Sequence, residues 1–251
     1  NYEGTLMLTN SELSGNSGYS GGAAHNDHGC LTLTDCTLSA NSTSATGGGI
    51  FNEGTLTMVR CTFLGNSARR YGGAIYSYSG TVSLTNSALL GNSAGDYGGA
   101  IRNSGSLIAT NTLFSGNSSG RYGGGIYNDA GMLTVTDSTL SGNATDGNGY
   151  RYGSAGRGGG IYSTGWLTVT NSTLSGNWAI GNTEDTSDYP GGGGIYSSGT
   201  LRVTNSTFSG NLSYDGAGIY NSRTLTMTNS TLSGNSAERL GGGVYTTGSS
   251  S

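Results

Sequence analysis

Residues 158–177 read GGGIYSTGWLTVTNSTLSGN. Apolar and hydroxylated residues alternate from Leu167 to Thr170, and a period of two is typical of a short β-strand. The run of three glycines would break any helix, and no stripe with a 3.6-residue period survives between such runs. This stretch therefore predicts short strands joined by tight, glycine-rich turns, and it excludes a helical fold.

Similar stretches recur about every 25 residues along the 251 residues of the chain. The clearest marker is the asparagine of a Gly-Asn or equivalent dipeptide, which recurs at intervals of 24–26 residues apart from two intervals of 34. The two long intervals contain loop insertions near residues 144–156 and 178–190. Such a period through the whole chain indicates a solenoid. The marker asparagines are Asn16, Asn41, Asn66, Asn92, Asn117, Asn143, Asn177, Asn211 and Asn235.

Four apolar columns keep the register of this marker. In the quoted repeat they are Ile161, Leu167, Val169 and Leu174, and the other repeats place apolar residues at the equivalent positions. One repeat cannot bury these residues alone, but stacking repeats ~4.8 Å apart makes each column part of a continuous interior. The predicted fold is all-β: a single parallel β-helix domain over residues 1–251, with about nine to ten coils of ~25 residues and three short strands per coil.

Polar columns follow the same period. We expect the marker asparagines to form an interior ladder, each amide bonding to those above and below, with the asparagines in the left-handed backbone region at strand bends. A second, less strict bend column contains Arg60, which cannot lie unpaired in a dry interior and is therefore expected to point outward. The members of this bend column are Asn10, Asp35, Arg60, Asn86, Asn111, Asp137, Asn171, Asn205 and Asn229.

Composition alone would suggest disorder. Leu, Ile, Val and Phe make up 41 of 251 residues, below the ~20% that globular cores usually need, but nearly all of them fall in the four columns. The net charge is −4, with ten Arg, no Lys and no basic run, which excludes a nucleic-acid binder. No apolar stretch approaches the ~20 residues of a membrane span, so we expect no membrane insertion of this segment. Residues 1–30 lack the pattern of a signal peptide, which we expect to lie outside this chain.

Two motifs alternate along the chain. GGAI occurs at residues 72–75 and 98–101, and FxxN at residues 63–66, 114–117 and 208–211. This pair resembles the repeats of the polymorphic outer-membrane proteins and related right-handed parallel β-helix passengers of bacterial surface proteins. The resemblance covers essentially all nine coils and implies a right-handed β-helix with an extracellular or cell-surface location in bacteria. The same scaffold is similar to that of pectate lyases and other polysaccharide enzymes, so it implies a fold more specifically than a function.

The residue after the isoleucine column is usually aromatic, and it points outward if isoleucine points inward. An exposed aromatic ladder follows, which could stack sugar rings, pack against a neighbouring rod, or only cover the coil. A shorter second stripe lies near the glycine turns at Tyr71, Tyr97 and Tyr122. The main ladder comprises Phe51, Tyr76, Tyr127, Tyr162, Tyr196, Tyr220 and Tyr245, with Arg102 interrupting it.

Outward positions of the Leu-Thr-Val-Thr strands are mostly threonine, in an array that resembles those of ice-binding proteins. Met7, Val59, Ile108 and Arg202 interrupt the array. Threonine is also the ordinary residue of exposed strands, which is the simpler interpretation.

A candidate metal site lies near the start of the chain. His25, Asp27, His28 and Cys30 fall within six residues, and their side chains suit a transition metal. The spacing matches no zinc module, and the same residues fit an ordinary turn between strands. We expect no cofactor and no resident metal.

Other reactive side chains are few. Cys36 and Cys61 share a column one coil apart, a separation that suits either a disulfide or two stacked free thiols. The acidic residues Glu184, Asp185 and Asp188 cluster in the second insertion, which reads as a solvated loop rather than a calcium or catalytic site. We therefore name no catalytic residue.

The leading functional hypothesis is a non-enzymatic structural or adhesive β-solenoid outside the cell. The chain begins and ends in the same turn of the repeat without polar caps, so we expect head-to-tail stacking into a homopolymer or a place within a longer surface rod. The expected partners are other copies of the chain or neighbouring rods. One alternative is an adhesin segment that binds glycans or a host surface, and another is a polysaccharide lyase or hydrolase of the pectin-lyase type.

Overall fold

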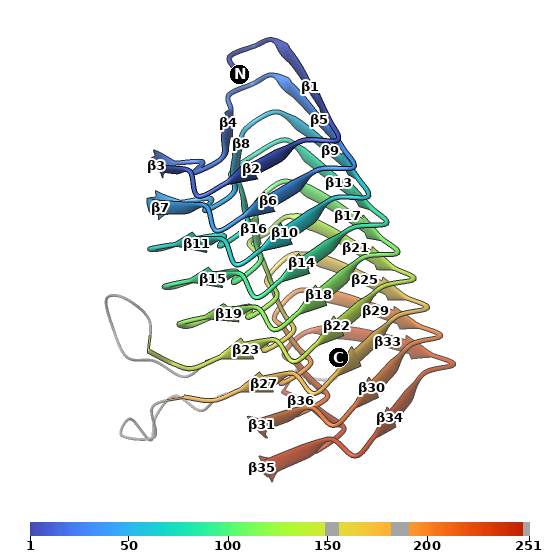
Figure 1. Cartoon of the computed structure of the whole chain (residues 1–251). Coiled ribbons are helices and arrows are strands. Elements are labelled where there is room, and N and C mark those ends of the chain that lie inside the picture. Colours follow the sequence, from blue (N-terminus) through green and yellow to red (C-terminus); the bar gives the residue numbers. More distant parts are fainter. Residues whose placement is uncertain (149–155, 182–190, 248–251) are drawn as a thin grey trace.

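The computed structural model is a parallel β-helix in which each coil contributes one strand to each of four sheets (Figure 1). The structure describes residues 1–148, 156–181 and 191–247. Each sheet has nine parallel strands, and each strand pairs with the equivalent strand of the next coil. Among the described residues there is no helix with the length and apolar character needed to cross a membrane.

The first sheet is built from the five-residue strands that carry the Leu-Thr-Val-Thr pattern. Its strands are β1 (Thr5–Thr9), β5 (Cys30–Thr34), β9 (Thr55–Val59), β13 (Thr81–Thr85), β17 (Ser106–Thr110), β21 (Met132–Thr136), β25 (Trp166–Thr170), β29 (Thr200–Thr204) and β33 (Thr224–Thr228). The second sheet follows after a sharp bend. Its strands are β2 (Glu12–Ser14), β6 (Thr37–Ser39), β10 (Thr62–Leu64), β14 (Ala88–Leu90), β18 (Leu113–Ser115), β22 (Thr139–Ser141), β26 (Thr173–Ser175), β30 (Thr207–Ser209) and β34 (Thr231–Ser233).

The third sheet is made of short strands that follow the marker asparagines. Its strands are β3 (Ser17–Ser20), β7 (Ser42–Thr46), β11 (Ser67–Ala68), β15 (Ser93–Ala94), β19 (Ser118–Ser119), β23 (Ala144–Thr145), β27 (Trp178–Ala179), β31 (Leu212–Asp215) and β35 (Ser236–Leu240). The fourth sheet begins at the isoleucine column. Its strands are β4 (Ala24–Asn26), β8 (Ile50–Asn52), β12 (Ile75–Ser77), β16 (Ile101–Asn103), β20 (Ile126–Asn128), β24 (Ile161–Ser163), β28 (Ile195–Ser197), β32 (Ile219–Asn221) and β36 (Val244–Thr246).

The three strands predicted for each coil are those of the first, second and fourth sheets. The parallel solenoid, in which each coil pairs in register with the next, is confirmed. The third sheet is additional. Several of its strands have only two residues, such as Ser67–Ala68 and Ser93–Ala94. A strand this short shows no alternation in the sequence, because period-two patterning needs at least four residues to be read.

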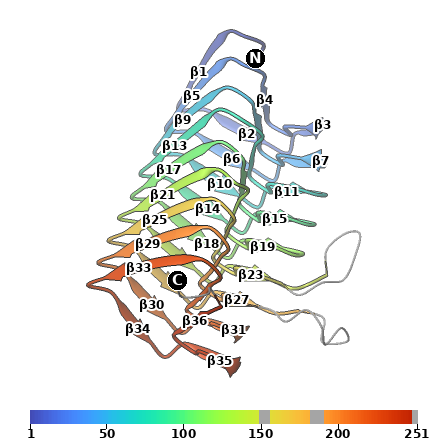
Figure 2. The same ribbon diagram turned by 180° about the vertical axis from the view of Figure 1, so that it is seen from behind.

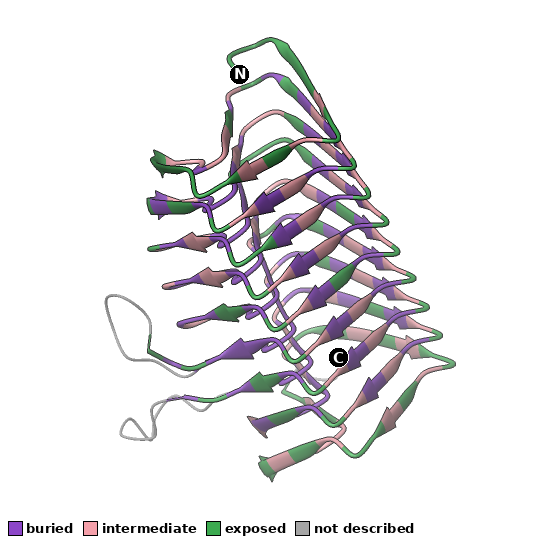
Figure 3. Cartoon of the chain, viewed as in Figure 1, coloured by how far each residue is buried: buried purple, intermediate pink, exposed green. Residues whose placement is uncertain are grey.

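One continuous core runs through the coils. In the quoted repeat Ile161, Val169 and Leu174 have no exposed surface and Leu167 is 1% exposed. Burial is deepest in the middle coils, whereas the first and last coils are largely exposed (Figure 3). The few large apolar residues are therefore enough to form a core, because every coil places them at the same interior positions.

The backbone of the marker column differs from the expectation, whereas the second bend column is a left-handed bend. The marker asparagines do not adopt the left-handed conformation; the residue before each of them does, as at Gly65 (φ 61°) and Gly116 (φ 63°). In the second bend column the polar residue itself is left-handed, with φ of 54° at Arg60 and 47° at Asn111. The marker amide has to reach inward to its neighbours, so the preceding residue, which is Ala40 before Asn41 and glycine before every other marker, takes the left-handed bend.

Candidate functional site

The marker asparagines lie inside the solenoid as a continuous hydrogen-bonded ladder. Asn117 donates from its Nδ2 to Asn143 Oδ1 (2.8 Å) and to the carbonyl of Leu89 (2.9 Å), and its backbone N–H also donates to Asn143 Oδ1 (3.1 Å). The markers from Asn41 to Asn211 have no exposed surface, whereas Asn16 is exposed and Asn235 is half-buried at the ends. These side chains hold the coils together, and those from Asn41 to Asn211 are inaccessible to a ligand.

A second buried polar column was missed by the sequence analysis. It ends the strands of the fourth sheet, where Asn103 Nδ2 donates to Asn128 Oδ1 (2.8 Å) and Asn128 Nδ2 donates to Ser163 Oγ (3.1 Å). The signal was available, because these residues stand two positions after the inward isoleucines and so point the same way. Its fully buried members are Asn26, Asn52, Ser77, Asn103, Asn128, Ser163, Ser197 and Asn221.

The aromatic ladder is not the exposed face that was expected. Tyr76, Tyr127 and Tyr162 are only 6–9% exposed, and Phe51, Tyr196, Tyr220 and Tyr245 are half-buried. The second stripe covers the first: the Tyr97 ring stacks 5.0 Å from Tyr127, and the Tyr122 ring lies 4.8 Å from Tyr162. The faces of the Tyr127 and Tyr162 rings are therefore occupied by other rings.

Arg102 stands at the one position of the aromatic ladder that lacks a ring, and its guanidinium interacts with the neighbouring rings. Its guanidinium carbon lies 4.9 Å from the ring centre of Tyr76 and 5.7 Å from that of Tyr127. The same group donates to the Tyr76 hydroxyl (2.6 Å) and to Asp129 Oδ2 (2.8 Å). A cation over aromatic faces is stabilising, which explains why arginine is accepted in this column.

The free energy of unfolding is expected to fall as the pH rises above about 10. Burial raises the pKa of the Tyr127 and Tyr162 phenols, so these groups ionise in the unfolded chain before they do so in the folded protein. The stability is fully present below the ordinary tyrosine pKa and is lost above it. Urea unfolding on either side of this pH measures the loss. Tyr127→Phe with Tyr162→Phe should make the loss smaller, and an unchanged loss would contradict the prediction.

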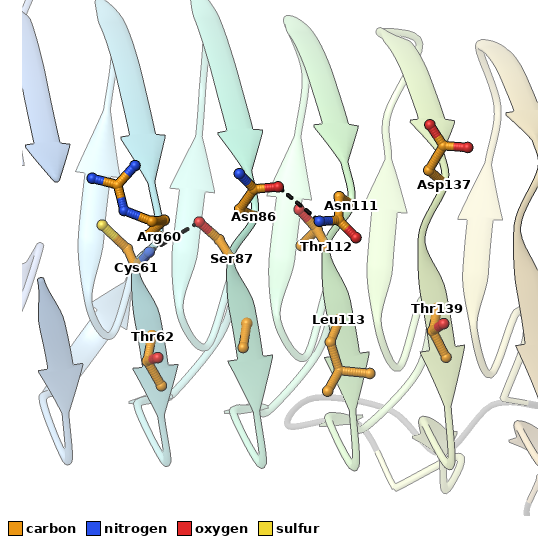
Figure 4. Close-up of a pocket in the computed structure, with 11 residues that line it drawn as sticks. Arg60, Cys61, Thr62, Asn86, Ser87, Asn111, Thr112, Leu113, Asp137 and Thr139 are labelled. Atoms are coloured by element: carbon orange, nitrogen blue, oxygen red, sulfur yellow. Dashed lines mark hydrogen bonds between the residues drawn. The ribbon is translucent and has the colours of Figure 1, made fainter. Parts of the chain in front are cut away.

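A groove of about 410 Å³ lies at the bend between the first and second sheets. Figure 4 shows its polar wall, in which Asn111 Nδ2 donates to Asn86 Oδ1 (2.7 Å) and the Cys61 N–H donates to Ser87 Oγ (3.1 Å). The groove is lined by Arg60, Cys61, Thr62, Asn86, Ser87, Ala88, Asn111, Thr112, Leu113, Asp137 and Thr139. A second groove, of about 530 Å³, is lined by Asn10, Ser11, Glu12, Asp35, Thr37, Ser39 and Leu64.

Chemically, the first groove is suited to hydrogen bonding. Arg60 points outward as predicted and holds Asp35 through two hydrogen bonds of 2.6 and 2.7 Å. This contact lowers the pKa of Asp35. Of the described residues that line the groove, Asp137 alone carries a carboxylate, and it accepts a hydrogen bond from Asn171 (3.1 Å). Glycoside hydrolysis generally uses a pair of carboxylates, and the described lining of this groove supplies one.

The candidate metal residues are only partly brought together. Asp27 and His28 meet Glu53 of the next coil, with their ligand atoms within 4.8 Å of one another. His28 Nδ1 lies 2.5 Å from Asp27 Oδ1, and this hydrogen bond raises the pKa of His28. The inclusion of His25 and Cys30 was wrong: the His25 ring stacks on Phe51 at 4.5 Å, and Cys30 is exposed at the start of β5.

Cys36 and Cys61 are buried free thiols in the structure. They occupy a column in which Ser87 and Ser138 bond neighbouring coils, and each cysteine Sγ contacts a carbonyl of its own coil, Thr34 for Cys36 and Val59 for Cys61. Burial raises the pKa of the Cys61 thiol, so the thiol is held in its protonated, less nucleophilic form. The acidic cluster Glu184, Asp185 and Asp188 lies outside the described residues.

Two large exposed side chains lie next to each other on the first sheet, and the sequence did not single them out. Trp166 is 67% exposed and Met132 is 62% exposed, side by side on β25 and β21. The signal was their presence in an outward column that is otherwise threonine, serine or cysteine.

Comparison with known proteins agrees with this architecture. A family model described as a right handed beta helix region matches residues 75–251. A model of the Chlamydia polymorphic membrane protein repeat matches residues 60–78. No curated protein and no solved structure matches the chain.

Proposed function

This chain belongs to the family of right-handed β-helix proteins, and from that premise we propose that it is a stiff structural and adhesive rod displayed on a bacterial surface. The observation that carries the proposal is the register, which continues through nine strands in each of the four sheets. Interior ladders such as that of Asn117 bond each coil to the next. A solenoid bonded in this way resists bending, as a spacer or adhesive stalk requires. The polymorphic membrane protein repeat supports a bacterial surface location.

The proposed rod lengthens by stacking of copies, end to end. The two end coils of the described solenoid leave apolar side chains uncovered, with Leu6, Leu240 and Val244 each 37–38% exposed. Equivalent residues of the middle coils, such as Leu133 and Ile126, are 0–2% exposed. A further coil placed in register, from a second copy or from a longer surface rod, would cover these side chains and pair the strand edges.

Electron microscopy of the purified protein over a range of concentrations tests this assembly. The expected result is particles of constant width whose length grows with concentration. Monodisperse short particles at every concentration would contradict end-to-end stacking. Release of products from pectin-like polymers would contradict the non-enzymatic role and favour the lyase or hydrolase alternative.

A further inference from the structure

The outward face of the first sheet carries an aromatic platform that the fold itself does not need. Trp166 and Met132 are paired in register on neighbouring strands, and they are 67% and 62% exposed. The same column holds Thr5, Cys30, Thr55, Thr81, Ser106, Thr200 and Thr224 in the other coils. In the other coils this position holds threonine, serine or the cysteine Cys30, so coil packing does not explain the indole and the thioether.

Hydroxyl groups and one cation surround this platform. Two residues further along the strands, Thr134, Thr168 and Arg202 occupy the next outward row on β21, β25 and β29. Arg202 is exposed and makes no ion pair with any residue of the described parts of the chain. No outward position of the first sheet holds a carboxylate, so Arg202 is the only charge on this face. Figure 2 shows these strands stacked as one continuous wall.

We propose that this face binds an acidic saccharide, a glycan with a carboxylate on its sugar ring. The exposed indole of Trp166 offers a flat apolar surface for the C–H face of a sugar ring, with Met132 extending it. The Thr134 and Thr168 hydroxyls can each donate and accept hydrogen bonds to sugar hydroxyls. Arg202 supplies the planar donor fork that matches a carboxylate.

The composition of the face distinguishes this ligand from an apolar one. A protein partner that covered the platform with apolar side chains would leave the threonine hydroxyls and the Arg202 guanidinium buried without partners, which is costly. A polyhydroxylated acid satisfies all three kinds of group together. The inference rests on the adhesive role proposed above and names the ligand class and the face that binds it.

Tryptophan fluorescence tests the proposal, because the chain has only two tryptophans. Trp178 lies in the third sheet on β27, so the Trp178→Phe protein reports on Trp166 alone. The probes are a galacturonic acid tetramer, sialyllactose and, as a neutral counterpart, maltotetraose. We expect a saturable change in fluorescence with at least one acidic probe and a weaker response to maltotetraose.

Variants locate the site, with binding measured by calorimetry in the otherwise unchanged protein. Trp166→Thr restores the usual residue of the column and should fold normally, and it should weaken binding of the acidic probe by about tenfold or more. Arg202→Gln should weaken binding of the acidic probe and leave the affinity for maltotetraose unchanged. Trp178→Phe should change the affinity for neither probe. Absence of binding by both acidic probes, or equal affinity of the Trp166→Thr variant and the parent, would overturn the proposal.

The same samples separate this inference from the proposed rod. If Trp166→Thr still assembles into rods in electron microscopy but loses the acidic glycan, the face is assigned and the assembly is independent of it. If the parent binds the glycan through Trp166 but never assembles, the end-to-end stacking is contradicted and the glycan site stands.

Discussion

Replacing Gly99 with alanine is expected to lower the free energy of unfolding by about 3 kcal/mol or more. A Cβ at this position would lie 2.1 Å from the carbonyl oxygen of Gly124 and 2.4 Å from that of Ser118. Both atoms belong to the backbone of the next coil, so no side-chain rotation can relieve the clash. The Gly99 N–H also donates to the Gly123 carbonyl at 3.0 Å, and separating the coils would lengthen this bond.

Gly116→Ala is the matched control, because it adds the same methyl group in open space. Gly116 has φ of 63° and no atom within 4 Å of its Cβ position. Its replacement costs only the left-handed strain of a residue with a Cβ, about 1 kcal/mol. Urea denaturation followed by circular dichroism measures both variants. A loss at Gly99 no larger than that at Gly116 would show that the coils can separate without penalty.

Asn117→Ala is expected to cost about 3–5 kcal/mol, because it removes one step of the interior ladder. The substitution leaves the Asn92 N–H and Nδ2 without their acceptor, which they reach at 2.9 and 3.0 Å. It also removes the Nδ2 donor to Asn143 Oδ1 and to the Leu89 carbonyl, whereas the backbone N–H of residue 117 still donates to Asn143 Oδ1. Each buried polar group left unpaired costs about 1–3 kcal/mol.

Asn111→Ala provides the comparison on the exposed column. Asn111 donates to Asn86 at 2.7 Å on the surface, where water can replace the lost bond. The remaining cost is that of alanine at φ 47°, about 1 kcal/mol. Guanidinium unfolding of the two variants should therefore differ by a few kcal/mol. Equal losses would mean that the interior ladder contributes no more than a surface amide pair.

The sequence predicted the environment of the inward side chains better than that of the outward ones. Period two places Leu167 and Val169 inward and Thr168 outward, and the structure confirms this alternation. The same rule makes Tyr127 an outward residue, yet Tyr127 is only 9% exposed, because the rings of Tyr97 from the preceding coil and Tyr122 from its own coil stack against it. Alternation predicts the direction of a side chain, but it does not predict which other side chains pack over it.

The candidate sites show the same limit. His25 and His28 are close in sequence, but His25 stacks on Phe51 while His28 meets Glu53, which is 25 positions further along the chain. Met132 and Trp166 are 34 positions apart, separated by an insertion, and they become neighbours only through the pairing of β21 with β25. Strand register determines which residues meet across coils. Where a loop insertion lengthens the interval between repeats, a fixed period of about 25 residues no longer identifies these neighbours.

The sequence by itself determined the parallel solenoid, its coil length, its apolar columns and the interior position of the marker asparagines. These follow from one-dimensional periodicity, because equivalent residues in stacked coils must share an environment. Only the tertiary structure decided that the tyrosines cover one another, that the residue before each marker asparagine takes the left-handed bend, and that Trp166 and Met132 form one platform. Those outcomes depend on the path of the turns and on contacts between outward side chains, which a repeating pattern of inward residues leaves free.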